Sequence, residues 1–230
     1  MESNSLDKII NKKKEKLNLL KNKFKIKNLK YKIDKFDKYL DFKEKIFSNF
    51  SQGKFSLIAE IKKTSPSAGV IIEDYDPVDI AAIYEKNKAT CLSVLTEEDF
   101  FNGSLDHIAK IKEQINLPIL CKDFFIDKFQ IPLAKSFGAD AILLIVAALN
   151  QNQIEELYNT ALEYKMSVII EVHTIEEAKR ISGFSNAMIG INNRNLKTLK
   201  TDLNNTFEIY KTLNNFDGIL ISESRIKNKD

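Results

Sequence analysis

The chain has 230 residues, of which 43% are hydrophobic and 29% are charged, proportions typical of a globular domain and not of a disordered chain. No apolar run approaches the ~18 residues that a membrane span requires, and the first residues lack the basic-then-apolar pattern of a signal peptide. Cys91 and Cys121 lie inside apolar runs, and His107 and His173 have no spacing typical of zinc ligands. We therefore expect no disulfide, no metal site, no membrane contact and a cytoplasmic location.

The formal net charge of +3 hides an asymmetry. Residues 1–45 contain 15 lysines and 7 acidic residues, a local charge of +8, so the remainder carries −5. A basic arm of this kind is one pattern of nucleic-acid binding. The chain has only three arginines against 32 lysines, however, and arginine is the cation best suited to bidentate contacts with bases and phosphates. We interpret lysine as the ordinary surface cation and predict no nucleic-acid partner.

In chain order, two amphipathic helices are expected first, at 6–21 and 36–48, and they predict an N-terminal helical cap over residues 1–50 that packs on an end of the domain. From residue 55 onward a strand-then-helix rhythm repeats. Seven apolar runs predict parallel strands at 55–62, 89–96, 116–123, 139–146, 166–172, 186–192 and 217–224. Six amphipathic segments predict helices at 77–87, 104–115, 128–137, 150–164, 174–182 and 203–213.

Local signals support these helix boundaries. Asp76, and Thr174 with Glu177 three residues later, mark helix starts, while Gly138 and Gly183 lie where helices are expected to end. Seven strands and six intervening helices predict a parallel α/β domain, and both a doubly wound open sheet and a closed barrel satisfy that count. No G-x-G-x-x-G follows the first strand and no P-loop occurs, which disfavours the nucleotide-binding open sheets and predicts no cofactor.

Polar residues at the carboxyl ends of the predicted strands favour the barrel. Barrel enzymes build their active sites from the ends of several different strands. The residues concerned here are Glu60 and Lys62 on the first strand, Lys122 on the third, Glu171 on the fifth, Asn192 on the sixth, and Glu223 and Ser224 on the seventh. Since side chains alternate along a strand, we expect the charged ones to point into the barrel interior.

Two lysines and two carboxylates meeting in one cavity suit acid–base chemistry. Glu60 and Lys62 alone fit a structural ion pair that closes the barrel equally well, because interior charges are costly unless they are paired or functional. Lys122 and Glu171 add a second lysine and a second carboxylate. Such groups shift one another's pKa values and can supply an acid and a base near neutral pH. The sequence therefore predicts a catalytic site at this end of the barrel.

Several segments carry a family resemblance. AEIKKTSPSAG (59–69) resembles the E-x-K-x-x-S-P-S-x-G signature of indole-3-glycerol phosphate synthases. Similar to that family's segments, in the family's order, are SVLTEEDFFNGS (93–104), ILCKDFFIDKFQI (119–131), ADAILLIVAAL (139–149), IIEVHTIEEA (169–178), IGINNRNLKTLKTD (189–202) and ISES (221–224). The resemblance implies a tryptophan-pathway enzyme that closes and decarboxylates 1-(2-carboxyphenylamino)-1-deoxyribulose 5-phosphate and then removes water, with no cofactor.

The resemblance also implies roles for individual residues. Lys122 would protonate the substrate carbonyl during ring closure, and Glu171 would be the base of the dehydration. Glu60 would hold Lys122 or the substrate hydroxyl groups, and Lys62 would grip the departing carboxylate together with Asn192 and Arg194. The remaining substrate contacts would come from Ser224 beside the phosphate, Glu223 next to it, the loop residues Ser65 and Ser67, and an apolar slot of Phe101, Phe124, Leu143 and Leu199 for the aromatic ring.

Two features depart from the family. Arg225 stands where the family has a glycine whose backbone approaches the phosphate, and the sequence stops at residue 230, where the family continues with an eighth strand. We therefore expect a TIM (β/α)8-type barrel with an N-terminal helical extension that lacks the eighth β/α unit, as one domain (1–230) with strands over 55–224 and a tail at 225–230. Open barrel edges would favour self-association, and association with other tryptophan-pathway enzymes is a further expectation.

Two alternatives to this enzyme stay open at the level of sequence. One is a non-catalytic remnant that needs a partner or an extra strand to close the barrel. The other keeps a catalytic barrel but makes Lys122 a Schiff-base lysine of the aldolase type, which borohydride trapping would reveal.

Overall fold

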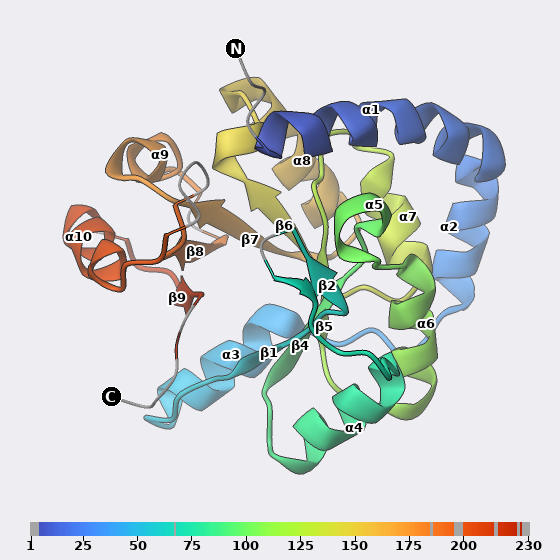
Figure 1. Cartoon of the computed structure of the whole chain (residues 1–230), viewed down its shortest axis with the longest axis horizontal. Coiled ribbons are helices and arrows are strands. Elements are labelled where there is room, and N and C mark those ends of the chain that lie inside the picture. Colours follow the sequence, from blue (N-terminus) through green and yellow to red (C-terminus); the bar gives the residue numbers. More distant parts are fainter. Residues whose placement is uncertain are drawn as a thin grey trace.

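A computed structural model describes residues 5–66, 68–184, 186–195, 200–213, 216–224 and 226. Its centre is a parallel sheet of seven strands in the order β1-β4-β5-β6-β7-β8-β9. These strands are β1 (Ile58–Ile61), β4 (Cys91–Leu95), β5 (Ile119–Lys122), β6 (Ala141–Ile145), β7 (Ser167–Val172), β8 (Met188–Asn192) and β9 (Leu220–Glu223). The sheet curls into an incomplete barrel with helices around its outside (Figure 1).

Helices connect the successive strands on the outer face of the sheet (Figure 1). They are α4 (Pro77–Lys86), α5 (Glu98–Phe101), α6 (Leu105–Gln114), α7 (Gln130–Ser136), η1 (Val146–Ala148), α8 (Gln151–Glu163), α9 (Ile175–Arg180) and α10 (Asn204–Thr212). The predicted caps form, since the Asp76 carboxylate accepts the amide of Val78 at 2.7 Å and the Thr174 hydroxyl accepts that of Glu177 at 3.2 Å. All seven predicted strands and six predicted helices are confirmed, while the short helix α5 was not anticipated.

The strands separate two apolar clusters because their side chains alternate. The outward-facing residues, such as Leu92, Ile142 and Ile170, pack under the surrounding helices. The inward-facing residues form a second cluster, made of Cys91, Leu120, Ala141, Leu143, Ile145, Ile169 and Met188 with Phe42 and Ile46 from a helix at its end. The catalytic candidates continue the inward-facing series at the carboxyl ends of the strands, as the alternation predicts.

The N-terminal region differs from the expectation of two helices. It contains three, namely α1 (Ser5–Lys23), α2 (Ile26–Lys35) and α3 (Phe42–Ser51), and residues 36–41 are not helical. Tertiary hydrogen bonds hold that segment extended, because the Leu40 amide donates to Asp140 Oδ1 at 2.7 Å and the Tyr39 hydroxyl donates to the Lys135 carbonyl at 2.8 Å. The Asp41 carboxylate then caps α3. The predicted helix at 36–48 was therefore wrong in its first half.

The three helices also occupy different places (Figure 1). At the amino ends of the strands, α3 inserts Phe42 into the inner cluster, and its Lys43 amide donates to Ser167 Oγ at the start of β7. At the carboxyl ends, α1 is held by Lys13, whose ammonium lies 2.6 Å from the Asp123 carboxylate just beyond β5. The N-terminal helices therefore do not form a cap on one end of the domain, since α1 lies at the carboxyl ends of the strands and α3 at their amino ends.

A small hairpin of β2 (Thr64–Ser65) and β3 (Gly69–Val70) follows β1 and was not predicted. Within the described part of the chain, β1 and β9 each pair with a strand on one side only. A search of the same residues finds no helix with the length and apolar character needed to cross a bilayer.

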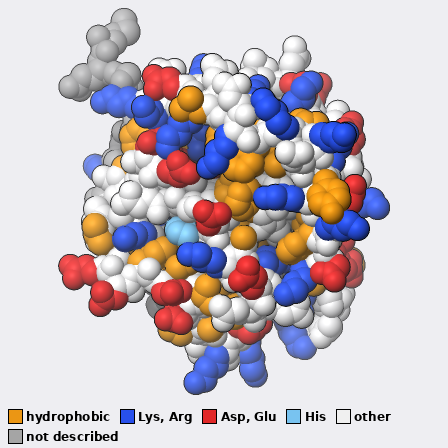
Figure 2. All heavy atoms as spheres, turned by 90° about the vertical axis from the view of Figure 1, so that its right-hand side faces the viewer, with side chains coloured by type: hydrophobic (Ala, Val, Ile, Leu, Met, Phe, Trp, Pro, Cys, Tyr) orange, Lys and Arg blue, Asp and Glu red, His pale blue; other side chains and the backbone are white. Residues whose placement is uncertain are grey.

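Basic side chains do not gather on the face that carries α2 and α6. Figure 2 shows Lys and Arg side chains there interspersed with acidic and apolar ones. Some of the positive charges of the α1 lysines are neutralised by ion pairs within the fold, since Lys16 lies 2.8 Å from Glu98 and Lys21 lies 2.6 Å from Asp127. The basic composition of the first 45 residues therefore does not translate into a continuous basic surface on this face.

Candidate active site

Lys122 is the centre of a charged cluster on the inward-facing side of the sheet. It is the last residue of β5, and its Nζ lies 2.8 Å from Glu223 Oε2 and 3.3 Å from Glu171 Oε2. Glu171 comes from β7 and Glu223 from the end of β9, so three strands that are distant in sequence supply the three groups. The Lys122 side chain keeps 20% of its surface exposed, whereas Glu171 keeps only 4%. The cluster can therefore present an ammonium to a ligand from a largely desolvated setting.

His173 extends this cluster from behind Glu171. Its Nε2 lies 3.1 Å from Glu171 Oε1, and its Nδ1 lies 3.3 Å from Glu177 Oε2 at the start of α9. The sequence reading missed this residue, because it considered the histidines only as metal ligands. A signal was present nonetheless, since His173 is two residues after Glu171 and therefore shares its face of the strand.

The charges within the cluster shift the pKa values of Lys122 and Glu171 in opposite directions. Burial opposes the charged form of Lys122, but the nearby carboxylates of Glu223, Glu171 and Glu60 outweigh it and raise its pKa. Burial likewise opposes ionisation of Glu171, yet the charges of Lys122 and His173 hold its pKa well below the usual range. Lys122 is therefore an ammonium and Glu171 a carboxylate at neutral pH.

Glu223 behaves differently from Glu171 although both contact Lys122. Burial raises the pKa of Glu223, and repulsion from Glu171 adds to the effect, so that the pKa rises to about 7 despite the attraction of Lys122. For His173, burial is outweighed by contacts with Glu171 and Glu177, which raise its pKa to about 9. The site thus holds one carboxyl group that exchanges its proton near neutral pH and one that stays ionised.

Glu60 and Lys62 lie beside this cluster on β1. The two side chains form an ion pair with each other, and Glu60 keeps 37% of its surface exposed. Burial opposes the ionisation of Glu60, but the charges of Lys122 and Lys62 lower its pKa. Glu60 is close enough to Lys122 for that charge to lower its pKa, and the ion pair keeps the Lys62 ammonium beside the Glu60 carboxylate.

Asn192, Ser224 and Arg194 meet at the ends of β8 and β9. The Ser224 hydroxyl donates to Asn192 Oδ1 at 2.8 Å, and the Arg194 amide donates to the same oxygen at 3.0 Å. Ser224 has a left-handed backbone (φ 72°), a strained conformation for a residue with a side chain. Among the described residues, the Arg194 Nε atom is buried and has no hydrogen-bond partner.

Asn193 is a second residue that the sequence reading missed. Its side-chain amide donates to Ser222 Oγ at 3.1 Å and to the Glu223 carbonyl at 2.9 Å, while its Oδ1 accepts the Thr206 hydroxyl at 2.8 Å. The side chain is buried, so these contacts fix the end of β9 against β8 and α10. Alternation along β8 separates the two neighbours, since Asn192 shares the inward face with Gly190 whereas Asn193 falls on the other face.

The aromatic and loop residues that were expected to contact the substrate differ in where the structure puts them. Phe101 and Phe124 come together, with ring centroids 6.5 Å apart and planes tilted by 36°. Leu143 has no exposed surface and belongs to the inner cluster. On β6 it is Ile145 that pairs with Glu171 of β7, so Leu143 lies two residues short of the level of the charged cluster. Ser65 is buried in the β2–β3 hairpin, where its hydroxyl accepts the Ala68 amide at 3.2 Å. Ser67, Leu199 and Arg225 lie outside the described residues.

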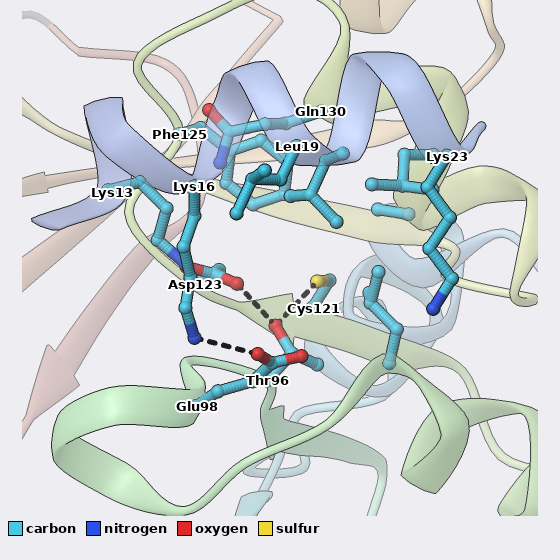
Figure 3. Close-up of a pocket in the computed structure, with 14 residues that line it drawn as sticks. Lys13, Lys16, Leu19, Lys23, Thr96, Glu98, Cys121, Asp123, Phe125 and Gln130 are labelled. Atoms are coloured by element: carbon cyan, nitrogen blue, oxygen red, sulfur yellow. Dashed lines mark hydrogen bonds and ion pairs between the residues drawn. The ribbon is translucent and has the colours of Figure 1, made fainter. Parts of the chain in front are cut away.

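A cavity beneath α1 adjoins the charged cluster but is distinct from it (Figure 3). It lies between α1 and the ends of β4 and β5, and its lining includes Leu20, Phe125 and Leu133. The Asp123 carboxylate accepts the Thr96 hydroxyl at 2.8 Å on its wall. Cys121 and Asp123 point to this side of β5 and Lys122 to the other, because successive side chains of a strand face opposite ways. Over the described residues, no cluster of His, Cys, Asp or Glu could hold a metal ion.

Comparisons with known proteins agree with this geometry. The sequence profile of the family "Indole-3-glycerol phosphate synthase" matches residues 6–230. The indole-3-glycerol phosphate synthase of Trichodesmium erythraeum (strain IMS101) is 41% identical over 97% of this chain and 76% of its own length. That of Desulforamulus reducens (strain ATCC BAA-1160 / DSM 100696 / MI-1) is 39% identical over 98% of this chain and 84% of its own length.

Two solved structures share the fold at low sequence identity. The alpha subunit of tryptophan synthase from Legionella pneumophila str. Paris has a TM-score of 0.57 and 13% identity, over 82% of this chain and 79% of that one. The 3-keto-L-gulonate-6-phosphate decarboxylase from Vibrio cholerae O1 biovar El Tor str. N16961 has a TM-score of 0.51 and 14% identity, over 73% and 78%. These likenesses confirm the predicted TIM-type α/β fold. The profile match and the identity to the curated relatives go further, and they show that the chain belongs to the indole-3-glycerol phosphate synthase family.

Proposed function

We propose that the chain acts as a carbon–carbon lyase that converts 1-(2-carboxyphenylamino)-1-deoxyribulose 5-phosphate into indole-3-glycerol phosphate, carbon dioxide and water. The observation that carries this proposal is the Lys122 ammonium held between Glu171 and Glu223 at the carboxyl ends of the strands, in a member of this family. The fold places such a constellation where barrel enzymes carry their active sites.

Lys122 serves the ring closure. The ring carbon that bears the carboxylate attacks the substrate carbonyl, and the electron pair of the C=O bond takes a proton from the Lys122 ammonium to become a hydroxyl group. The carboxylate then leaves as carbon dioxide, and the electrons of the broken C–C bond restore the aromatic ring. Because aromaticity absorbs these electrons, the step needs no cofactor as an electron sink. Glu223, whose pKa is about 7, can carry a proton at neutral pH and return it to Lys122 afterwards.

Glu171 serves the dehydration. Loss of the new hydroxyl group as water requires a proton on the departing oxygen and removal of a proton from the adjacent carbon. Glu171 is ionised at neutral pH, since Lys122 and His173 lower its pKa, and a carboxylate can accept the proton from carbon. Glu223, whose pKa is about 7, can exchange a proton with the cluster in the same step.

The remaining candidates fit the two anionic ends and the aromatic ring of this substrate. Lys62 and Arg194 would supply cationic groups for the carboxylate, together with Asn192, whose Oδ1 accepts the Ser224 hydroxyl. Phe101 and Phe124 can contain the aromatic ring. We assign Ser224 to the phosphate end, Ser65 and Ser67 to the loop over the substrate, and Leu199 to the aromatic slot, whereas Leu143 has no exposed surface and can support that slot only from beneath.

Indole fluorescence tests the proposal directly. Mixing the purified chain with the carboxyphenylamino-deoxyribulose phosphate should produce an indole signal, and Lys122→Met should abolish it while circular dichroism stays unchanged. No signal from the folded wild-type chain, or full turnover in Lys122→Met, would overturn the assignment. The Schiff-base alternative is disfavoured by the geometry, since a lysine that two carboxylates hold as an ammonium is a poor nucleophile.

Self-association and a cytoplasmic location belong to the same proposal. The described strands β1 and β9 offer free edges, and exposed Phe50, Phe55 and Leu57 lie in α3 and the segment that leads into β1. Two copies can cover these edges mutually. Cys91 and Cys121 are both free and buried, which suits a reducing compartment.

A further inference from the structure

His173 is a buried histidine that bridges two carboxylates. Its side chain keeps 5% of its surface exposed, with Nε2 at 3.1 Å from Glu171 Oε1 and Nδ1 at 3.3 Å from Glu177 Oε2. With an acidic partner at each ring nitrogen, the imidazole is favoured with both nitrogens protonated. The Nε2 atom has no well-aligned hydrogen-bond acceptor, so its contact with Glu171 acts mainly through charge.

The backbone around His173 is held as firmly as its ring. The His173 amide donates to Glu177 Oε2 at 2.6 Å, so one carboxylate oxygen receives both the amide and the ring of the same residue. The Asn205 side chain of α10 donates to the carbonyls of His173 at 3.2 Å and of Asn192 at 3.0 Å. This arrangement fixes the ring behind Glu171 and connects it to the end of β8.

The position of His173 makes the two carboxylates beside Lys122 unequal. Glu171 lies between two cations, Lys122 from β5 and His173 from its own strand. Among the described residues, the cation that contacts Glu223 of β9 is Lys122 alone, and the ionised Glu171 repels Glu223. Glu177 from α9 is the other charged group that contacts the ring, and Asn205 from α10 is neutral. The negative charge is therefore held by Glu171, and the exchangeable proton is held by Glu223.

We propose that His173 is a positioning residue which, as an imidazolium braced by Glu177, keeps Glu171 ionised and oriented and thereby leaves Glu223 as the proton-carrying member of the cluster. This inference rests on the proposed function for its catalytic consequence, while the charge state of His173 is a property of the protein alone. The two can therefore be tested separately.

The charge state is tested by nuclear magnetic resonance of the 15N-labelled imidazoles. The chain has two histidines, and His107→Gln assigns their signals. His173 should be doubly protonated at pH 7 and titrate near pH 9, whereas burial lowers the pKa of His107. Glu171→Gln should bring the His173 titration down by a unit or more, about tenfold in proton affinity. Titration of His173 at or below pH 6.5 in the wild-type protein would overturn the inference.

The catalytic consequence is tested with His173→Gln, with His107→Gln as the matched control on α6. We expect kcat to fall at least about tenfold at pH 7 with little change in KM, and the acidic limb of its pH profile to move to higher pH because Glu171 loses a cation. Glu177→Gln, which removes only the brace, should move the limb less and in the same direction. An unmoved limb in both variants would refute the positioning role. If the wild-type chain makes no indole product, the proposed function is wrong. The titration of the His173 imidazole would still decide whether His173 has the inferred charge state.

Discussion

Gly190 has no side chain, and this absence leaves space for the Glu223 carboxylate in the charged cluster. It lies on β8, pairs with Glu171 of β7, and faces the interior. A Cβ atom built there would lie 2.1 Å from Glu223 Oε1 and 3.1 Å from Ile169 Cγ2. The Glu223 carboxylate therefore packs against the bare backbone of β8, and the contact between Glu223 and Lys122 depends on that close approach.

Gly190→Ala should accordingly displace the Glu223 carboxylate from Lys122. Because that side chain is flexible, we expect the fold to persist and kcat to fall at least about tenfold, the size typical of a misplaced acid–base group. Gly183→Ala is the control, since an added Cβ there meets no atom within 4 Å. Equal loss of activity in the two variants would show that Glu223 does not need the space at Gly190.

Glu223 also predicts a pH dependence of stability. Its pKa is raised from 4.5 to about 7 in the folded protein, so the folded state binds this proton more tightly than the unfolded state. The resulting stabilisation is fully present below about pH 4.5 and is lost as the pH rises through about 7. Glu223→Gln, which is always neutral, should lack this loss. Its Tm relative to wild type should rise between pH 4.5 and 7.5 in thermal melts; a constant difference would contradict the raised pKa.

At the scale of elements, α1 is attached to the carboxyl ends of the strands through one buried ion pair. Lys13 and Asp123 keep 7% and 11% of their side chains exposed, and the Thr96 hydroxyl donates to the same carboxylate (Figure 3). Burial opposes the charge on Lys13, but Asp123 outweighs it and raises the pKa of the lysine. The pair therefore connects a helix that is early in the sequence to the residue that directly follows Lys122.

Lys13→Met should loosen α1 by leaving Asp123 buried without its partner, at a cost of about 3 kcal/mol. Hydrogen exchange should show faster exchange of amides in 5–23 while the strand amides stay protected, because the helix opens locally before the barrel unfolds. Lys8→Met, at an exposed position of the same helix, is the control. Unchanged protection of α1 in Lys13→Met would mean that its apolar contacts and its other ion pairs hold it without Lys13.

For the whole molecule, the exposed aromatic residues next to the described edge strand β1 predict self-association. Phe50 and Phe55 are 73% and 96% exposed, in α3 and in the segment before β1. Sedimentation velocity should give an average mass that rises with concentration, and Phe50→Lys with Phe55→Lys should weaken association at least about tenfold by removing apolar contact. Tyr31→Lys changes an aromatic residue of similar exposure on α2 and should have no effect. A monomer at every concentration would refute the expectation.

Much of the fold was predictable because its signals are local. The period of two along each strand placed Glu60, Lys122 and Glu171 on the inward face, and the caps at Asp76 and Thr174 set helix starts within one residue. The prediction failed where contacts distant in sequence decide. Residues 36–41 were read as helix from their apolar spacing, but hydrogen bonds to Asp140 and Lys135 hold them extended.

The sequence by itself determined the family, the order of strands and helices, and the identity of the charged residues at the strand ends, because alternation, capping and motifs are properties of neighbouring residues. Only the tertiary structure decided how those charges divide their work. The contacts of Lys122 with Glu171 and Glu223, and the space that Gly190 leaves for Glu223, join residues from different strands. Their pKa values follow from burial and distance in three dimensions, which no local pattern records.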